Sequence, residues 1–120
     1  MRGDVPTDLP LEVVARKTGD VTVLCLAGQI NEMGADVLSA ELDRVLEEGD
    51  CRLIFDLSDV NFLSSTGLGQ VMRAYRAVKG HGFVRIAGPQ PLVADLFKLT
   101  KLDKLLVIYP TVQEALAQPQ

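Results

Sequence analysis

Tryptophan is absent from the 120 residues of this chain, and the other aromatic side chains are two tyrosines and four phenylalanines. Because single-stranded nucleic acids are usually bound by aromatic side chains that stack on their bases, this scarcity argues against such a partner. The formal net charge of -4 argues the same way, since a phosphate backbone attracts a basic surface. We therefore expect no nucleic-acid partner.

Long apolar runs are also missing. The longest stretch, Val21 to Ala27, is far too short to cross a bilayer. The first six residues are polar and include Pro6, unlike the apolar segment of a signal peptide. These features predict a cytoplasmic protein without membrane insertion.

Metal-binding and catalytic side chains are scarce, with two cysteines and one histidine. Cys25 and Cys51 have no partner at ligand spacing, so burial in the core is the favoured interpretation over a metal or redox role. His81 lies in a glycine-flanked turn, which argues against a Ser-His-Asp triad. We expect no metal, no cofactor, no catalytic residue and no enzymatic activity.

The remaining sequence has the length of one domain and reads as an α/β pattern after a flexible lead-in of residues 1–10. Strands are predicted at 11–17, 21–27, 52–57, 82–87 and 105–109. Helices are predicted to follow Asn31, Ser64–Thr66, Gln90 and Thr111. The domain is expected to span residues 11–117.

The order of these elements predicts the topology. A short turn makes the first two strands an antiparallel hairpin. The continuous apolar run at 52–57 is typical of a parallel strand covered on both faces. With right-handed crossovers, we expect an α/β fold with a mixed, mostly parallel sheet, an N-terminal antiparallel hairpin and four α-helices.

Functional crevices in open α/β sheets lie beyond the carboxyl ends of the strands. Two such ends carry polar residues, namely Gly28–Asn31 and the stretch from Asp56 to Asp59 that leads into Ser64–Gly67. Asp56 and Asp59 could form a carboxylate pair for metal or acid-base chemistry, but the favoured interpretation is that they end a strand and shape a turn.

Three consecutive hydroxyls, Ser64, Ser65 and Thr66, precede the second helix. One of them can cap the helix while another carries a modification. A phosphate here would face unpaired backbone amides and the positive end of the helix dipole, a contribution of about 0.3–1 kcal/mol when exposed. An enzymatic nucleophile at Ser65 would lack a positioned base.

Two further features leave alternatives open. Gly67 and Gly69, in the first turns of that helix, indicate either close approach of a partner to the backbone or tight packing of the helix on the sheet. Arg73, Arg76 and Lys79 form either a solvated helix face or a basic ridge for an acidic partner.

The stretch Asp56-Leu57-Ser58-Asp59-Val60-Asn61-Phe62-Leu63-Ser64-Ser65-Thr66-Gly67-Leu68-Gly69 resembles the STAS domain family, and most closely its bacterial anti-sigma factor antagonists. The segment Phe97–Leu102 resembles a second family region, and the likeness extends over roughly residues 11–117.

This resemblance implies a protein whose unphosphorylated form binds an anti-sigma factor and so releases a sigma factor. The anti-sigma factor would be a GHKL-type serine kinase that phosphorylates Ser65, and a phosphatase would reset the switch. The chain itself would be a monomer or a weak dimer. The partner-binding residues would be Asn31, Asp56, Ser58, Phe62, Ser64, Ser65, Thr66, Gly67, Leu68 and Gly69.

The sequence departs from the family pattern at two places. Ser64 stands where the family usually has an aspartate before the phosphorylated serine, and Gln29 and Asn31 replace the usual glutamate and aspartate. These departures leave an alternative open, a non-phosphorylated STAS scaffold or accessory subunit of a signalling or lipid-transport complex.

Overall fold

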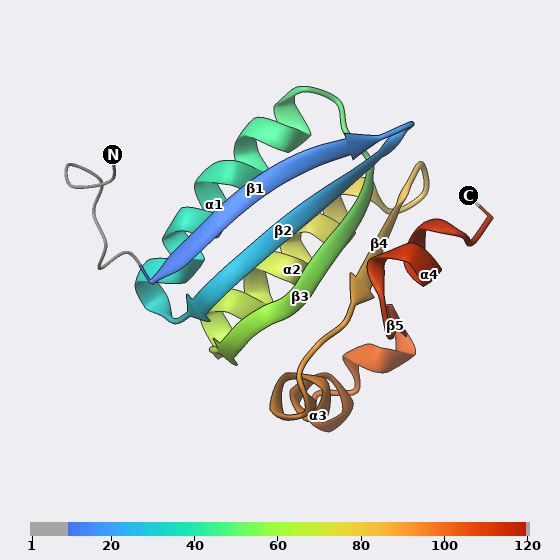
Figure 1. Cartoon of the computed structure of the whole chain (residues 1–120). Coiled ribbons are helices and arrows are strands. Elements are labelled where there is room, and N and C mark those ends of the chain that lie inside the picture. The colour runs from blue at the N-terminus through green and yellow to red at the C-terminus, as the bar shows by residue number, and fades with distance from the viewer. Residues whose placement is uncertain (1–9, 120) are drawn as a thin grey trace, which may run out of the picture.

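A computed structural model describes residues 10–119 of the chain, so nearly all of the predicted lead-in lies outside the described residues. Strands and helices alternate after an initial hairpin (Figure 1). The strands are β1 (Leu11–Thr18), β2 (Val21–Ile30), β3 (Arg52–Leu63), β4 (Phe83–Ala87) and β5 (Val107–Tyr109). The helices are α1 (Glu32–Glu47), α2 (Ser65–Val78), α3 (Pro91–Leu99), the 3-10 turn η1 (Leu102–Lys104) and α4 (Val112–Leu116).

One sheet joins the five strands in the order β1-β2-β3-β4-β5. β1 runs antiparallel to β2, and the other neighbouring strands are parallel. Gly19, in the hairpin turn, has a positive φ of 60°, a conformation that favours glycine. The predicted mixed sheet with an N-terminal hairpin and four α-helices is therefore confirmed.

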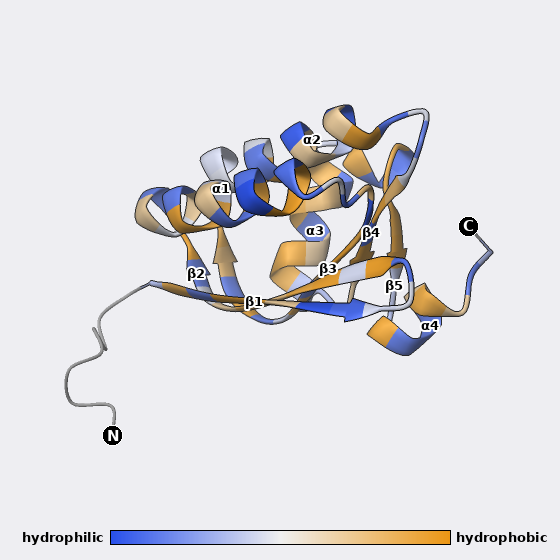
Figure 2. Cartoon of the chain, turned by 90° about the horizontal axis from the view of Figure 1, so that it is seen from above, coloured by the Kyte–Doolittle hydropathy of each residue, from blue (hydrophilic) through white to orange (hydrophobic). Residues whose placement is uncertain are grey.

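The helices lie in two layers on opposite faces of the sheet. α1, α2 and α3 cover one face, whereas α4 lies on the other (Figure 2). This arrangement explains the apolar run in β3, where Leu53, Ile54 and Phe55 are all 0% exposed. Leu53 and Phe55 belong to the large apolar cluster beneath the three helices, and Ile54 belongs to the smaller cluster under α4. Both faces of the strand are thus buried, as the continuous pattern predicts.

β3 extends six residues beyond the predicted end at Leu57, which corrects the interpretation of its two aspartates. Asp56 and Asp59 lie within the strand, and its pairing with β2 shifts register between them. The Asp56 carboxylate accepts hydrogen bonds from the Ser58 amide at 3.1 Å and the Ser58 hydroxyl at 2.7 Å. Asp56 therefore shapes a bulge in a continuing strand instead of a turn.

β5 is shorter than predicted. Leu105 and Leu106 follow η1 and precede the strand, which begins at Val107. Leu106 is 1% exposed and packs into the large cluster, so its apolar character reflects burial in the core without strand pairing.

Cys25 and Cys51 are both free and half-buried, so the predicted burial is incomplete. The Cys51 thiol donates to the carbonyl oxygen of His81 at 3.3 Å. Burial raises the pKa of the Cys25 thiol, and the nearby Asp56 carboxylate adds to that rise. Over residues 10–119, no helix has both the length and the apolar character needed to cross a membrane.

Candidate functional site

The ends of two parallel strands bring the starts of α1 and α2 together. In the β2–β3 pairing, Gln29 lies opposite Phe62 and Ile30 opposite Leu63, the last residue of each strand in that pair. The Ser64 amide then donates to the Ile30 carbonyl at 2.8 Å, extending the ladder past the end of β3. Both helices therefore begin at one edge of the sheet, as Figure 1 shows for the lower left of the molecule.

Both helix starts are capped by neutral side chains. The Asn31 side-chain oxygen accepts from the Gly34 amide at 2.9 Å. The Ser64 hydroxyl accepts from the Gly67 amide at 3.0 Å. The Asn31 cap is the predicted one, and among the three hydroxyls it is Ser64 that caps α2.

Ser65, the first residue of α2, is left available by this arrangement. Its side chain is exposed, and within residues 10–119 its hydroxyl makes no hydrogen bond. The backbone around it is held by the cap and by the Ile30 carbonyl, so the free hydroxyl stands on a fixed helix start. Chemically, this is an oxygen that another protein can reach and modify without breaking an internal contact.

Thr66 connects the two helices through a residue that the sequence did not single out. Its hydroxyl donates to the Glu32 carboxylate at 2.9 Å, and both residues are exposed. Glu32 is the first residue of α1, where a carboxylate is favoured by the helix dipole. The acidic first turn could have been noticed in the sequence, but its partner could not, because that depends on the β2–β3 register.

The two glycines of α2 have different surroundings. A Cβ added at Gly67 would lie 2.5 Å from Cγ2 of Ile30 and 2.8 Å from Cδ1 of Leu63, so this glycine allows tight packing on the sheet. A Cβ at Gly69 would meet nothing within 4 Å. Packing thus accounts for Gly67, whereas Gly69 faces open space.

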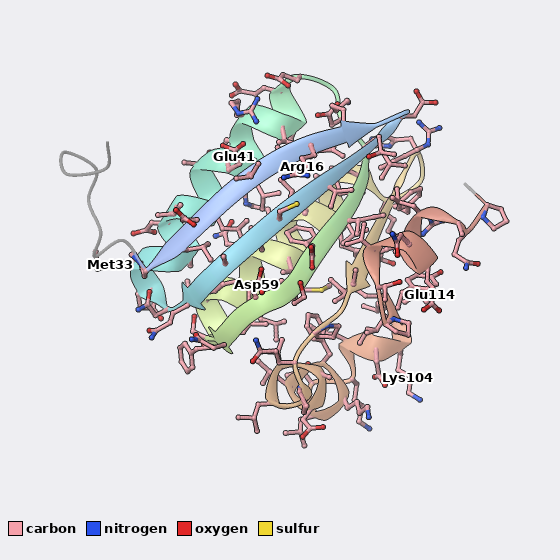
Figure 3. All side chains as sticks on the ribbon, in the orientation of Figure 1. Arg16, Met33, Glu41, Asp59, Lys104 and Glu114 are labelled. Carbon is pink, nitrogen blue, oxygen red and sulfur yellow. The ribbon has the colours of Figure 1, made fainter. Side chains whose placement is uncertain are left out.

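The apolar residues of the predicted site also differ in exposure. Leu68 is 7% exposed and belongs to the core, so its side chain is not presented at the surface. Phe62, at the end of β3, is 49% exposed, and Met33, in the first turn of α1, is 63% exposed. Figure 3 shows Met33 beside the start of β1, at the edge where α1 begins. Phe62 therefore lies close in sequence to the hydroxyls of α2, whereas Met33 is exposed at the start of α1.

Asp56 and Ser58 form a separate group, further back along β3. The Gln90 side-chain amide donates to the Ser58 carbonyl at 3.1 Å, and a Cβ at Gly88 would lie 3.3 Å from Cβ of Ser58. These contacts place Asp56 and Ser58 beside the loop that leads from β4 to α3. Asp59 likewise lies along the strand (Figure 3). The predicted site residues thus divide between two neighbourhoods.

The basic residues of α2 do not form a uniform ridge. Arg73 pairs with Asp43 of α1 at 2.9 Å and donates to the Ser39 carbonyl at 3.2 Å. Arg73 thereby ties α2 to α1, while Arg76 and Lys79 are exposed. Neither the solvated-face nor the ridge interpretation anticipated this role for Arg73.

Other kinds of site find little support in the described part of the chain. No group of three or more His, Cys, Asp or Glu residues there could hold a metal ion. A hollow of about 690 Å³ lies between α3 and β5, lined in part by Pro89, Lys98 and Tyr109. No residue from the starts of α1 and α2 lines this hollow, so it is distinct from the surface around Ser65.

Comparisons with a family model, with related sequences and with solved structures all point to the same protein family. The family model described as STAS domain matches residues 12–115. An anti-sigma F factor antagonist of Paenibacillus polymyxa is 25% identical over 101 residues, which cover 82% of this chain and 86% of that protein. A crystal structure of an anti-sigma factor antagonist from Mycobacterium paratuberculosis is 27% identical in sequence and superposes with a TM-score of 0.83. The aligned region covers 88% of this chain and 91% of the Mycobacterium chain.

A solved structure of the Bacillus cell fate determinant SpoIIAA in the phosphorylated form has the same fold. It is 19% identical, with a TM-score of 0.70 and coverage of 88% of this chain and 96% of its own. At that identity the likeness concerns the fold.

Proposed function

The chain belongs to the STAS domain family, and on that premise we propose that it is an anti-sigma factor antagonist switched off by phosphorylation of Ser65. The domain is proposed to span residues 11–117, from the start of β1 to Ala117, the residue that caps the end of α4. The anti-sigma factor would be a GHKL-type serine kinase, and a phosphatase would regenerate the active form. The names of the Paenibacillus and Mycobacterium relatives support the antagonist role.

One observation carries the proposal. Within residues 10–119 the exposed Ser65 hydroxyl makes no hydrogen bond, and the helix start on which it lies is already capped by Ser64. The exposed Phe62, at the end of β3, supplies apolar area close in sequence to the start of α2, and Gly69 leaves the adjoining backbone open to a partner. Together these residues form a surface suited to docking a protein.

The modification would proceed as a phosphoryl transfer from ATP. The Ser65 Oγ–P bond forms as the bond from the γ-phosphorus to the ADP oxygen breaks, and the hydroxyl proton passes to a base of the kinase. The reset is hydrolysis: a water oxygen bonds to the phosphorus as the bond from phosphorus to the Ser65 Oγ breaks. The serine oxygen takes up a proton, and inorganic phosphate leaves. This chain contributes the nucleophilic oxygen and its fixed position.

Phosphorylation would weaken binding because it changes the charge of the docking surface. A phosphoserine adds about -1.5 to -2 charges near neutral pH. A partner that accepted a neutral hydroxyl must then desolvate that charge, and each 1.4 kcal/mol of penalty lowers affinity about tenfold. A penalty of a few kcal/mol therefore suffices for an on-off switch.

The test uses the full chain with the serine kinase captured from its native host. Incubation with ATP should add the mass of one phosphoryl group, and peptide mapping should place it on Ser65. Ser65→Ala should abolish the addition, whereas Thr66→Ala, which removes the neighbouring exposed hydroxyl, should retain it. If ATP and the kinase add no phosphoryl group to the unmutated chain, the proposal is contradicted. Addition of the group to Ser65→Ala would contradict it as well.

A second candidate is a STAS scaffold or accessory subunit that binds its partners without phosphorylation. The neutral caps Asn31 and Ser64 favour it, because the family usually carries aspartates there. For this candidate, capture from the native host should recover a signalling or lipid-transport complex without a GHKL-type kinase. Ser65→Glu should then leave that capture unchanged, whereas the switch requires loss of the kinase.

A further inference from the structure

A carboxylate reaches the start of α2 from the neighbouring helix. Glu32 begins α1, and its Oε2 accepts the hydroxyl of Thr66, the residue that follows Ser65, at 2.9 Å. The two side chains are exposed and their residues lie 34 positions apart in sequence. This contact is therefore a tertiary link between two helix starts and does not belong to either helix alone.

The surroundings make this carboxylate the acidic member of the site. Both N-caps, Asn31 and Ser64, are neutral, and α2 has no acidic residue in its first turn. Asp36, the next acidic residue of α1, lies about one helical turn further along and is exposed. A hydrogen bond holds the Glu32 carboxylate at Thr66, the residue that follows Ser65.

We propose that Glu32 is a positioning residue that responds to the charge of a phosphate on Ser65, an inference that rests on the function proposed above. Through its hydrogen bond with Thr66, Glu32 would transmit the modification of α2 to the start of α1. A phosphate on Ser65 would be drawn to the amides at the α2 start and repelled by the Glu32 carboxylate. Phosphate and carboxylate would also compete for the Thr66 hydroxyl. Phosphorylation therefore releases Glu32 from Thr66 and removes this side-chain link between the starts of α1 and α2.

The consequence reaches the docking surface. Met33 follows Glu32 in the first turn of α1 and is 63% exposed. When Glu32 leaves Thr66, a carboxylate without that hydrogen bond stands next in sequence to this apolar side chain, while the Asn31 cap keeps the backbone of the turn in place. The modified form then differs from the unmodified one in the position of the Glu32 carboxylate at α1 as well as in charge at α2.

The test installs phosphoserine at position 65 during translation, so that no kinase is needed. A 31P NMR titration of this protein reports the second pKa of the phosphate. A neighbouring carboxylate disfavours the dianion, so the pKa should be about half a unit higher in the unmutated chain than in Glu32→Gln. The matched control Glu47→Gln, at the far end of the same helix, should give the unmutated value.

Amide NMR spectra of the unmutated chain and of Glu32→Gln supply a second measurement. On phosphorylation, the amide signals of residues 32–35 should move, and the same signals should move much less when Glu32→Gln carries the phosphate. Equal phosphate pKa values in the unmutated chain and Glu32→Gln would overturn the proposal, as would unmoved signals in the unmutated chain. A failed kinase assay would refute the proposed function and leave these two measurements unaffected.

Discussion

Gly67 and Gly69 offer a matched pair of substitutions in one helix, because their neighbourhoods differ. An alanine at Gly67 would bring its Cβ to 2.5 Å from Cγ2 of Ile30 and 3.1 Å from the Ile30 carbonyl oxygen. Ile30 is 0% exposed, so the side chain has no free space into which to withdraw. At Gly69 the added methyl group meets nothing within 4 Å.

The expected free energies follow from two opposing terms. Replacing glycine by alanine in a helix stabilises it by about 1 kcal/mol at either position. Overpacking of a filled core costs about 1–3 kcal/mol, and this term applies to Gly67→Ala alone. We therefore expect Gly67→Ala to lower the free energy of unfolding by up to about 2 kcal/mol, and Gly69→Ala to raise it by up to about 1 kcal/mol.

Urea unfolding followed by circular dichroism measures this difference. With an m-value of about 1–3 kcal/mol per molar urea, a gap of about 2 kcal/mol separates the two midpoints by roughly 1 M. If Gly67→Ala proves as stable as Gly69→Ala, the packing of α2 against Ile30 is not as described. Gly69→Ala also tests the proposed surface, since a partner that approaches this backbone should bind the variant more weakly.

Three further predictions concern the contacts around the site. Ser64→Ala should lower the free energy of unfolding by about 1 kcal/mol in thermal or urea unfolding, because the Gly67 amide loses its cap; an unchanged midpoint would exclude that cap. Arg73→Met should lower it by about 0.5–1 kcal/mol through loss of the partly exposed α1–α2 tie, whereas Arg76→Met should change it little. Burial, and then the Asp56 carboxylate, raise the pKa of the Cys25 thiol, so iodoacetamide at mildly alkaline pH should alkylate Cys25 more slowly than free cysteine. Alkylation of Cys25 should be faster in Asp56→Asn than in the unmutated chain. Mass spectrometry of the Cys25 peptide measures both rates, and slower alkylation in Asp56→Asn would contradict the reasoning.

Local chemistry made part of the fold predictable. Asn31 and Ser64–Thr66 mark helix starts because capping depends on residues within one turn. The apolar run at 53–55 indicates a strand covered on both faces, because consecutive side chains of a strand point to opposite sides of the sheet and all three are buried. The alternation of the later strands with helices, through right-handed crossovers, then predicts a mixed sheet with parallel strands, but not the order of those strands.

Features that depend on register could not be predicted. The Asp56–Ser58 contacts accompany a bulge that lets β3 continue, whereas the same residues read in sequence as a strand end. The contacts of Thr66 with Glu32 and of Arg73 with Asp43 cross from α2 to α1. Each requires knowledge of how far β2 and β3 extend before their helices begin, and that length is not encoded in any one local pattern.

Because the Ser65 hydroxyl makes no hydrogen bond within residues 10–119, phosphorylation should change the free energy of partner binding more than the free energy of unfolding. Since the hydroxyl contributes no hydrogen bond to the described fold, its modification removes no native contact of its own. The phosphate gains about 0.3–1 kcal/mol from the start of α2, and repulsion from Glu32 opposes that gain. The two forms of the domain should therefore have similar stability. Discrimination must then arise at the docking surface, where the partner meets the added charge and the Glu32 carboxylate released from Thr66.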